Sequence, residues 1–155
     1  DSETGYGHPH PSGRPIREVL LEELHGSLDH SRIHFLGRIP YDQLIAVLQA
    51  SWIHVYLSYP FVLGWSLLEA MACGCPIVGS VGMPVEEVIT DGVNGHLIPM
   101  DRPDILASKV SSLLSNEPLR QSFSLESRKT ALKYDQSITL PLIHDVIVNS
   151  LPLDQ

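Results

Sequence analysis

The chain has 155 residues, of which 43% are hydrophobic and 18% are charged, and its formal net charge is −8. This composition is sufficient for one domain with a buried core and excludes an intrinsically disordered chain. The ten Lys and Arg residues are scattered along the sequence, whereas a nucleic-acid-binding protein clusters them to neutralise phosphates, so we predict no nucleic-acid partner.

The sequence also predicts no disulfide, no metal site and no transmembrane segment. Cys73 and Cys75 are one residue apart, which suits neither a disulfide nor a zinc site, so we predict two reduced thiols. His8 and His10 lie in a Pro-rich loop without fixed geometry, and we predict no metal site there. No apolar run approaches the ~20 residues of a membrane span and no signal-peptide pattern opens the chain, so we predict no transmembrane segment and a cytoplasmic protein.

Apolar periodicity predicts short strands that alternate with helices. Helices are expected where apolar residues recur at three- and four-residue spacing, and strands where short apolar runs lie between turn residues. In chain order, the sequence predicts a helix at 15–26, a strand at 33–36, a helix at 41–51, a strand at 52–57, a helix at 65–73, a strand at 76–79, a helix at 85–89, a strand at 96–98, helices at 104–114 and 117–132, and a tail of mixed periodicity at 137–151, for which a final helix is one interpretation.

This alternation, with brief loops between the elements, predicts an α/β domain with a parallel sheet. In such sheets, ligands bind beyond the carboxyl ends of the strands, where helices begin. The loops that follow the predicted strands are therefore the places where a binding site is expected.

The loop before the predicted helix at 65–73 is the first candidate. Pro60 and Gly64 mark this loop, and the helix follows at once. The first N–H groups of a helix have no partner within it and lie at the positive end of its dipole, so they can bind a diphosphate. Gly64 would let a ligand approach the backbone closely, although many α/β proteins have a glycine before a helix.

Glu69 is the one charged residue of this otherwise apolar helix. Because an unpaired buried carboxylate is costly, we expect it to have partners. Ser66 lies on the same face, one turn from the predicted phosphate site, and a carboxylate at that distance can accept hydrogen bonds from both ribose hydroxyls. The pattern leaves two interpretations open, a ribose-binding carboxylate and an internal pair with an Arg or His.

The same stretch resembles the signature of retaining glycosyltransferases of GT-B architecture, the group that includes bacterial glycogen synthases, sucrose synthases and many α-mannosyltransferases. Residues 67–78 match the family's Leu-Leu-Glu-Ala-Met-Ala and the Gly-x-Pro-Val-Val that follows it. Residues 33–37 correspond to its Val-x-Phe-x-Gly, 84–89 to Pro-x-x-Glu-x-Ile, and 91–95 to Asp-Gly-x-x-Gly. The resemblance covers about residues 33–115, with the motifs in the family's order.

The resemblance implies a fold, a substrate and a set of binding residues. The fold is a Rossmann-like three-layer domain with a parallel sheet, the C-terminal half of a GT-B enzyme; it would occupy 1–155 as a single domain without its first strand. The donor is a nucleoside-diphosphate sugar, and Glu69 matches the carboxylate that holds its ribose. No cofactor or metal is implied. The other implied donor-binding residues are the loop and helix start that meet the diphosphate and the loop beside the base: Phe61, Leu63, Gly64, Trp65, Ser66, Leu67, Leu36 and Gly37.

Two features depart from the family's pattern. Phe61 stands where the family has its first motif Glu, and it cannot accept a hydrogen bond from a sugar hydroxyl. The family's basic pair, which follows the first strand of the domain, has no counterpart before residue 33; this is explained if that strand precedes Asp1. We therefore expect an N-terminal acceptor domain as the missing partner, and no catalytic residue is assigned in this chain.

The leading prediction is the donor-binding part of a hexosyltransferase-type enzyme that retains anomeric configuration, inactive as the isolated chain. One alternative is another enzyme of the same architecture, such as a sugar-nucleotide epimerase. A second alternative is a non-catalytic binding module. Phe61 favours this alternative, and Glu69 argues against it. An NAD-binding domain is disfavoured because no Gly-x-Gly-x-x-Gly follows the first predicted strand. The base, the sugar, the acceptor and the oligomeric state are not predicted.

Overall fold

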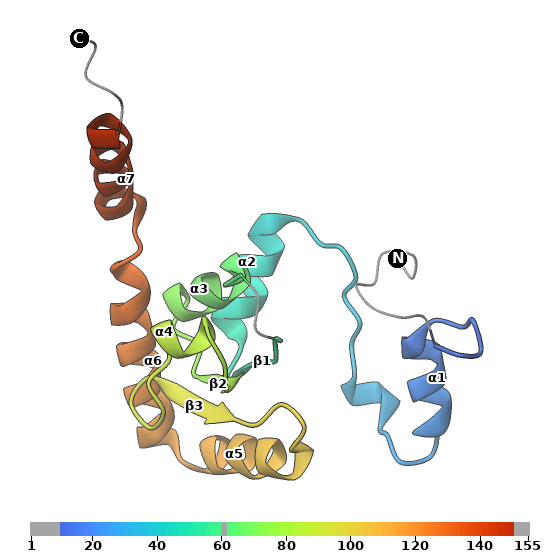
Figure 1. Cartoon of the computed structure of the whole chain (residues 1–155). Coiled ribbons are helices and arrows are strands. Elements are labelled where there is room, and N and C mark those ends of the chain that lie inside the picture. The colour runs from blue at the N-terminus through green and yellow to red at the C-terminus, as the bar shows by residue number, and fades with distance from the viewer. Residues whose placement is uncertain (1–9, 60–61, 151–155) are drawn as a thin grey trace. The chain divides into compact units, whose positions relative to one another are not determined.

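The computed structural model of the chain describes residues 10–59 and 62–150. It consists of two compact units, residues 1–40 and residues 41–155 (Figure 1). The positions of these units relative to one another are not determined, so each is described by itself. The prediction that 1–155 forms a single domain stays a prediction.

The N-terminal unit contains the helix α1 (Ile16–Glu23) and a short 3-10 helix, η1 (His30–Arg32). The predicted first helix is thus confirmed, and it ends shortly before Gly26, which has a φ of 96°. The strand predicted at 33–36 is wrong, because this segment is irregular and pairs with no described strand. A strand needs a neighbour for its backbone N–H and C=O groups, and apolar residues alone do not provide one.

The C-terminal unit contains a three-stranded parallel sheet in the order β1-β2-β3 (Figure 1). Val55 lies beside Val78, which in turn lies beside His96. The predicted α/β fold with a parallel sheet is therefore confirmed, and all the elements predicted from residue 41 onward are present. In chain order they are α2 (Tyr41–Ala50), β1 (His54–Tyr56), α3 (Trp65–Ala72), β2 (Ile77–Ser80), α4 (Val85–Val88), β3 (Gly95–Ile98), α5 (Pro103–Ser115), α6 (Glu117–Leu132) and α7 (Gln136–Ser150).

Two apolar clusters, one on each face of the sheet, form the core of this unit. Every residue of β2 is buried, which is typical of a parallel strand covered by helices on both sides. Ile77 packs with Leu67 and Met71 of α3, whereas Val78 packs with Leu113 of α5 and Phe123 of α6. Successive side chains of a strand point to opposite faces, so β2 belongs to both clusters and the unit has three layers.

None of the helices in the described part of the chain combines the length and the apolar character that crossing a membrane requires. The last helix, α7, has no buried residue.

The turn before β3 is held by Asp91. Its carboxylate accepts a hydrogen bond from the Leu97 N–H at 3.0 Å and lies 3.1 Å from Nδ1 of His96, which is buried. Burial raises the pKa of Asp91, but the hydrogen bonds from Leu97 and His96 outweigh it, so this pKa lies below its ordinary value. The ionised form of Asp91 therefore stabilises the fold.

Replacing Asp91 by Asn removes this charge but leaves an acceptor for Leu97. We expect a loss of at most about 1 kcal/mol near neutral pH, because the side chain is 56% exposed and solvent screens the charge. The pKa is depressed on folding, so the contribution is present above the unfolded value near 3.8 and is lost as the pH falls through the folded value. Melting temperatures of the two proteins should converge on acidification. A difference that does not change with pH would contradict this role.

Candidate functional site

Two serines connect the carboxyl ends of β1 and β2. The Ser58 N–H donates to Oγ of Ser80 at 3.0 Å, and this hydroxyl donates to the Ser58 carbonyl at 2.8 Å. Ser80 is fully buried and Ser58 is half-buried. The pair fixes the chain where it leaves β1, at the edge of the sheet where α/β proteins bind their ligands.

The first turn of α3 begins at the same edge. Gly64 caps the helix with its backbone alone, since it has no side chain to accept a hydrogen bond. Its N–H donates to the Tyr56 hydroxyl at 3.2 Å, and its carbonyl accepts from the Leu67 N–H at 3.1 Å. The N–H groups of Trp65 and Ser66 have no acceptor among the residues that the structure describes. These two amides, at the positive end of the helix, are available to an anion.

Glu69 lies in the middle of α3 and is half-buried. Within the described ranges it forms no ion pair, so the internal pair with an Arg or His that the sequence left open is not observed. Its neighbour is Tyr41, at the start of α2. The nearby Glu69 carboxylate, as a hydrogen-bond acceptor and then by its charge, raises the pKa of Tyr41. A carboxylate has several acceptor positions, so Glu69 can accept further hydrogen bonds.

The remaining predicted site residues divide by exposure. Trp65 and Ser66 are exposed, and 78% of Trp65 is accessible to solvent. Leu67 is fully buried, so only its backbone is close to the helix start, and Leu63 packs against the same apolar cluster. The prediction for these two leucines concerns their backbone, so the burial of their side chains is compatible with it, and it stays a prediction.

For three predicted residues the structure gives no position relative to this edge. Phe61 lies outside the described residues. Leu36 and Gly37 belong to the N-terminal unit, whose position relative to α3 is not determined. Conversely, sequence reasoning missed Tyr41 and Tyr56. No local pattern identifies either of them, because each contacts α3 or its cap from another element.

Cys73 and Cys75 are both free thiols, in agreement with the prediction. Burial, and then the charge of Glu69, raise the pKa of Cys73, while Arg128 acts in the opposite direction. Burial raises the pKa of Cys75 to about 11, and its Sγ donates to the Leu48 carbonyl at 2.9 Å. Both thiols therefore stay protonated near neutral pH and are poor nucleophiles. In the described part of the chain, no three His, Cys, Asp or Glu side chains form a group that could hold a metal.

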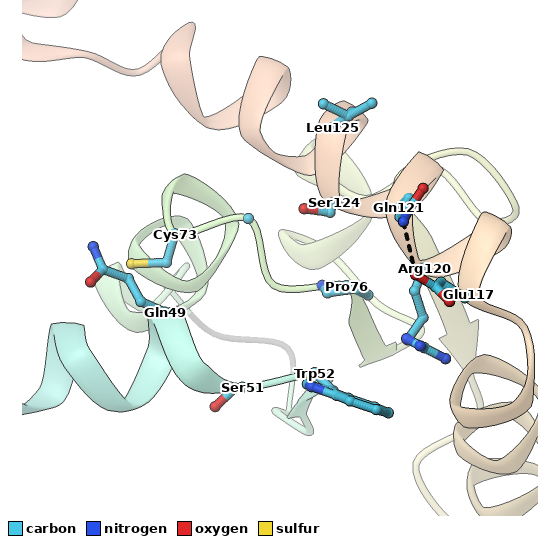
Figure 2. A pocket seen from close by; sticks show the side chains of 11 residues that line it. Gln49, Ser51, Trp52, Cys73, Pro76, Glu117, Arg120, Gln121, Ser124 and Leu125 are labelled. Atoms are coloured by element: carbon cyan, nitrogen blue, oxygen red, sulfur yellow. Dashed lines mark hydrogen bonds between the residues drawn. The ribbon is translucent and has the colours of Figure 1, made fainter.

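A shallow open hollow lies at the other end of the sheet, beside the residues that precede β1 and β2 (Figure 2). Its most prominent feature is Arg120, whose guanidinium lies 4.6 Å above the ring of Trp52. The same guanidinium donates to the carbonyls of Leu113 and Leu114, in the last turn of α5. Arg120 is thus used in joining α5, α6 and Trp52, and the hollow is separate from the edge where α3 begins.

Comparison with known proteins identifies the family of this chain. The sequence model of the family described as "Glycosyl transferases group 1" matches residues 18–130. The chain belongs to the group 1 glycosyltransferases. Within this group 1 sequence, the segment Leu-Leu-Glu-Ala-Met-Ala is mostly core, since Leu67, Ala70 and Met71 are fully buried. Glu69 is its one charged residue.

Curated relatives are longer than this group 1 chain. A phosphatidyl-myo-inositol mannosyltransferase of Mycobacterium leprae is 32% identical over 130 residues, which cover 81% of this chain and 33% of the relative. An uncharacterised glycosyltransferase of Methanocaldococcus jannaschii is 34% identical over 114 residues, which cover 73% of this chain and 29% of the relative. The chain thus spans roughly a third of the length of these proteins.

Solved structures share the fold. The C-terminal domain of a group 1 family protein from Francisella tularensis matches with a TM-score of 0.70 and 23% identity, over 80% of this chain and 64% of that one. The Anabaena protein HepE, in complex with UDP and glucose, matches with a TM-score of 0.74 and 22% identity, over 87% of this chain and 38% of that one. The predicted GT-B C-terminal fold is therefore confirmed.

Proposed function

We propose that this chain is the donor-binding domain of a retaining hexosyltransferase, which transfers a sugar from a nucleoside-diphosphate sugar to an acceptor. The observation that carries the proposal is the half-buried Glu69, which has no ion-pair partner within the described residues. It lies on α3 one turn after the amides of Trp65 and Ser66, for which the described residues offer no acceptor. In a group 1 chain, this arrangement fits a ribose and a diphosphate side by side.

The residues of this chain would act by binding and positioning. The amides of Trp65 and Ser66 would hold the diphosphate and stabilise the charge that develops on it as the sugar leaves. Glu69 would accept hydrogen bonds from the ribose and so orient the donor. Phe61, Leu63, Gly64 and the backbone of Leu67 complete the proposed loop and helix start, with Leu36 and Gly37 beside the base. No cofactor or metal is part of the proposal.

The acceptor would bind to another part of a longer protein. This part of the proposal is supported by the relatives, of whose length the chain spans roughly a third. We propose that an N-terminal domain supplies the acceptor site and any group that acts on the acceptor. A cytoplasmic location stays a prediction.

Nucleotide binding by the full-length protein tests the donor site directly. UDP, GDP and ADP, and the glucose and mannose derivatives of each, would be titrated by calorimetry. We expect one of the three bases to bind, with or without the sugar, and the melting temperature to rise with the concentration of that nucleotide. If no nucleotide binds, the proposed function is wrong, and the non-catalytic module that Phe61 favours becomes the better interpretation.

The 155-residue chain alone is expected to transfer no sugar, even with the donor that the full-length enzyme uses. Holding donor and acceptor together can lower a barrier by several kcal/mol, and this chain would hold only one of them. Incubation of both proteins with labelled donor and acceptor would compare the two rates. Product formation by the purified chain at a rate similar to that of the full-length enzyme would contradict the proposal that the acceptor binds to another part of the protein.

A further inference from the structure

Tyr56 connects the sheet to the start of α3. It is the last residue of β1, and its half-buried side chain packs against the core cluster that contains Leu67 and Met71. Its hydroxyl accepts the hydrogen bond from the Gly64 N–H at 3.2 Å. Through this bond, β1 holds Gly64, the residue that caps α3, although the two partners are eight residues apart in the sequence.

The contact also explains why a glycine stands at position 64. The backbone of Gly64 has φ −71° and ψ 134°, which any residue can adopt, so the reason is not conformational. A Cβ at this position would lie 2.7 Å from the Tyr56 hydroxyl oxygen, a distance that real Cβ atoms do not show, but 3.7 Å from Cζ of the same ring. The hydroxyl, and not the ring, excludes a side chain.

This hydrogen bond determines which amides of the helix start are available. α3 has no side-chain cap, so the direction of its first turn depends on the backbone of Gly64. The Gly64 N–H is used by Tyr56, and the Leu67 N–H is used by the Gly64 carbonyl. The amides of Trp65 and Ser66 lie between these two fixed points. If the hydroxyl were absent, Gly64 would lose its anchor and these amides would be less well oriented.

We propose that Tyr56 is a positioning residue for the donor: by holding Gly64, its hydroxyl orients the first turn of α3 toward a nucleoside diphosphate. This inference rests on the proposed function and assigns a residue that the motif does not contain. Tyr56 acts through the backbone, so its effect should concern the phosphates rather than the nucleoside.

The test uses the full-length protein and the nucleoside diphosphate that it binds among UDP, GDP and ADP. Tyr56→Phe keeps the ring in the core and removes only the hydroxyl. We expect the affinity for the diphosphate to fall about threefold to tenfold, the effect of one lost hydrogen bond. The affinity for the corresponding nucleoside should change by less than about twofold. Tyr134→Phe, at a partly exposed tyrosine between α6 and α7, is the matched control and should change neither.

A second variant tests the geometry. Gly64→Ala should weaken binding of the diphosphate in the wild-type background, because its Cβ would collide with the hydroxyl. In the Tyr56→Phe background the same Cβ meets the ring and Oγ of Ser66 at ordinary distances, so Gly64→Ala should have little further effect. The two substitutions should therefore be strongly non-additive, as expected for residues in direct contact.

The outcomes separate this inference from the proposed function. If the wild-type protein binds none of the three diphosphates, the proposed function is wrong and the inference is lost with it. If the wild type binds and Tyr56→Phe binds equally well, only the inference is wrong. It is also wrong if Tyr56→Phe weakens the nucleoside as much as the diphosphate, or if the two substitutions are additive, because Tyr56 would then be structural only.

Discussion

Replacing Phe123 by Ala is expected to destabilise the C-terminal unit by about 3–5 kcal/mol, the usual cost of removing a buried phenylalanine side chain. Phe123 is 1% exposed and belongs to the cluster formed with Val78, Ile98 and Leu113. Its ring also meets the His96 ring edge-on, with 5.0 Å between the centroids. The substitution therefore removes a large part of the packing of α6 against this face of the sheet and leaves a cavity that its neighbours fill only in part.

Urea unfolding of the full-length protein, followed through the transition of this unit, measures the loss. If the dependence of the free energy of unfolding on urea concentration is unchanged, a lower midpoint means a lower stability. Leu125→Ala is the matched control: it lies on the same helix, is 64% exposed, and should change the stability by no more than about 0.5 kcal/mol. A loss below about 1 kcal/mol for Phe123→Ala would mean that this face of the sheet is loosely packed.

Glu69→Gln is expected to weaken nucleoside-diphosphate binding by about 1–3 kcal/mol, the value of a charge-assisted hydrogen bond, while the protein still folds. Glu69→Leu should lose binding to a similar extent. It should fold as well as the wild type or better, since it removes a half-buried charge from a helix that packs on the core. Calorimetric titration of the full-length protein gives the affinity, and thermal unfolding gives the stability.

A matched control for Glu69 is Glu126→Gln. Glu126 is also a half-buried helical glutamate, but it pairs with Lys129 on α6, so its substitution should leave nucleotide affinity unchanged. If Glu69→Gln binds with normal affinity and Glu69→Leu is unfolded, Glu69 is a structural residue. In that case the contact with Tyr41 would be the reason for its presence in the helix.

Helices and buried strands of the C-terminal unit could be predicted from the sequence because their signals are local. The periodicity of α5 and the apolar run of β2 each reflect a pattern within one element. The strand expected at 33–36 shows the limit of such patterns. Its apolar residues suit a strand, but a strand exists only beside a partner, and no described segment pairs with it.

The family and the position of Glu69 could be read from the chain because the motif from Leu67 to Val78 is continuous, and the α/β class followed from the alternation of strands and helices. The surroundings of that motif could not be predicted, because they come from other elements. Glu69 raises the pKa of Tyr41 because α2 packs beside α3, and Tyr56 contacts Gly64 because α3 begins at the edge of the sheet where β1 ends. Contacts of this kind depend on how separate elements pack, and a hydroxyl that holds a backbone amide across a loop leaves no periodicity or motif in the sequence.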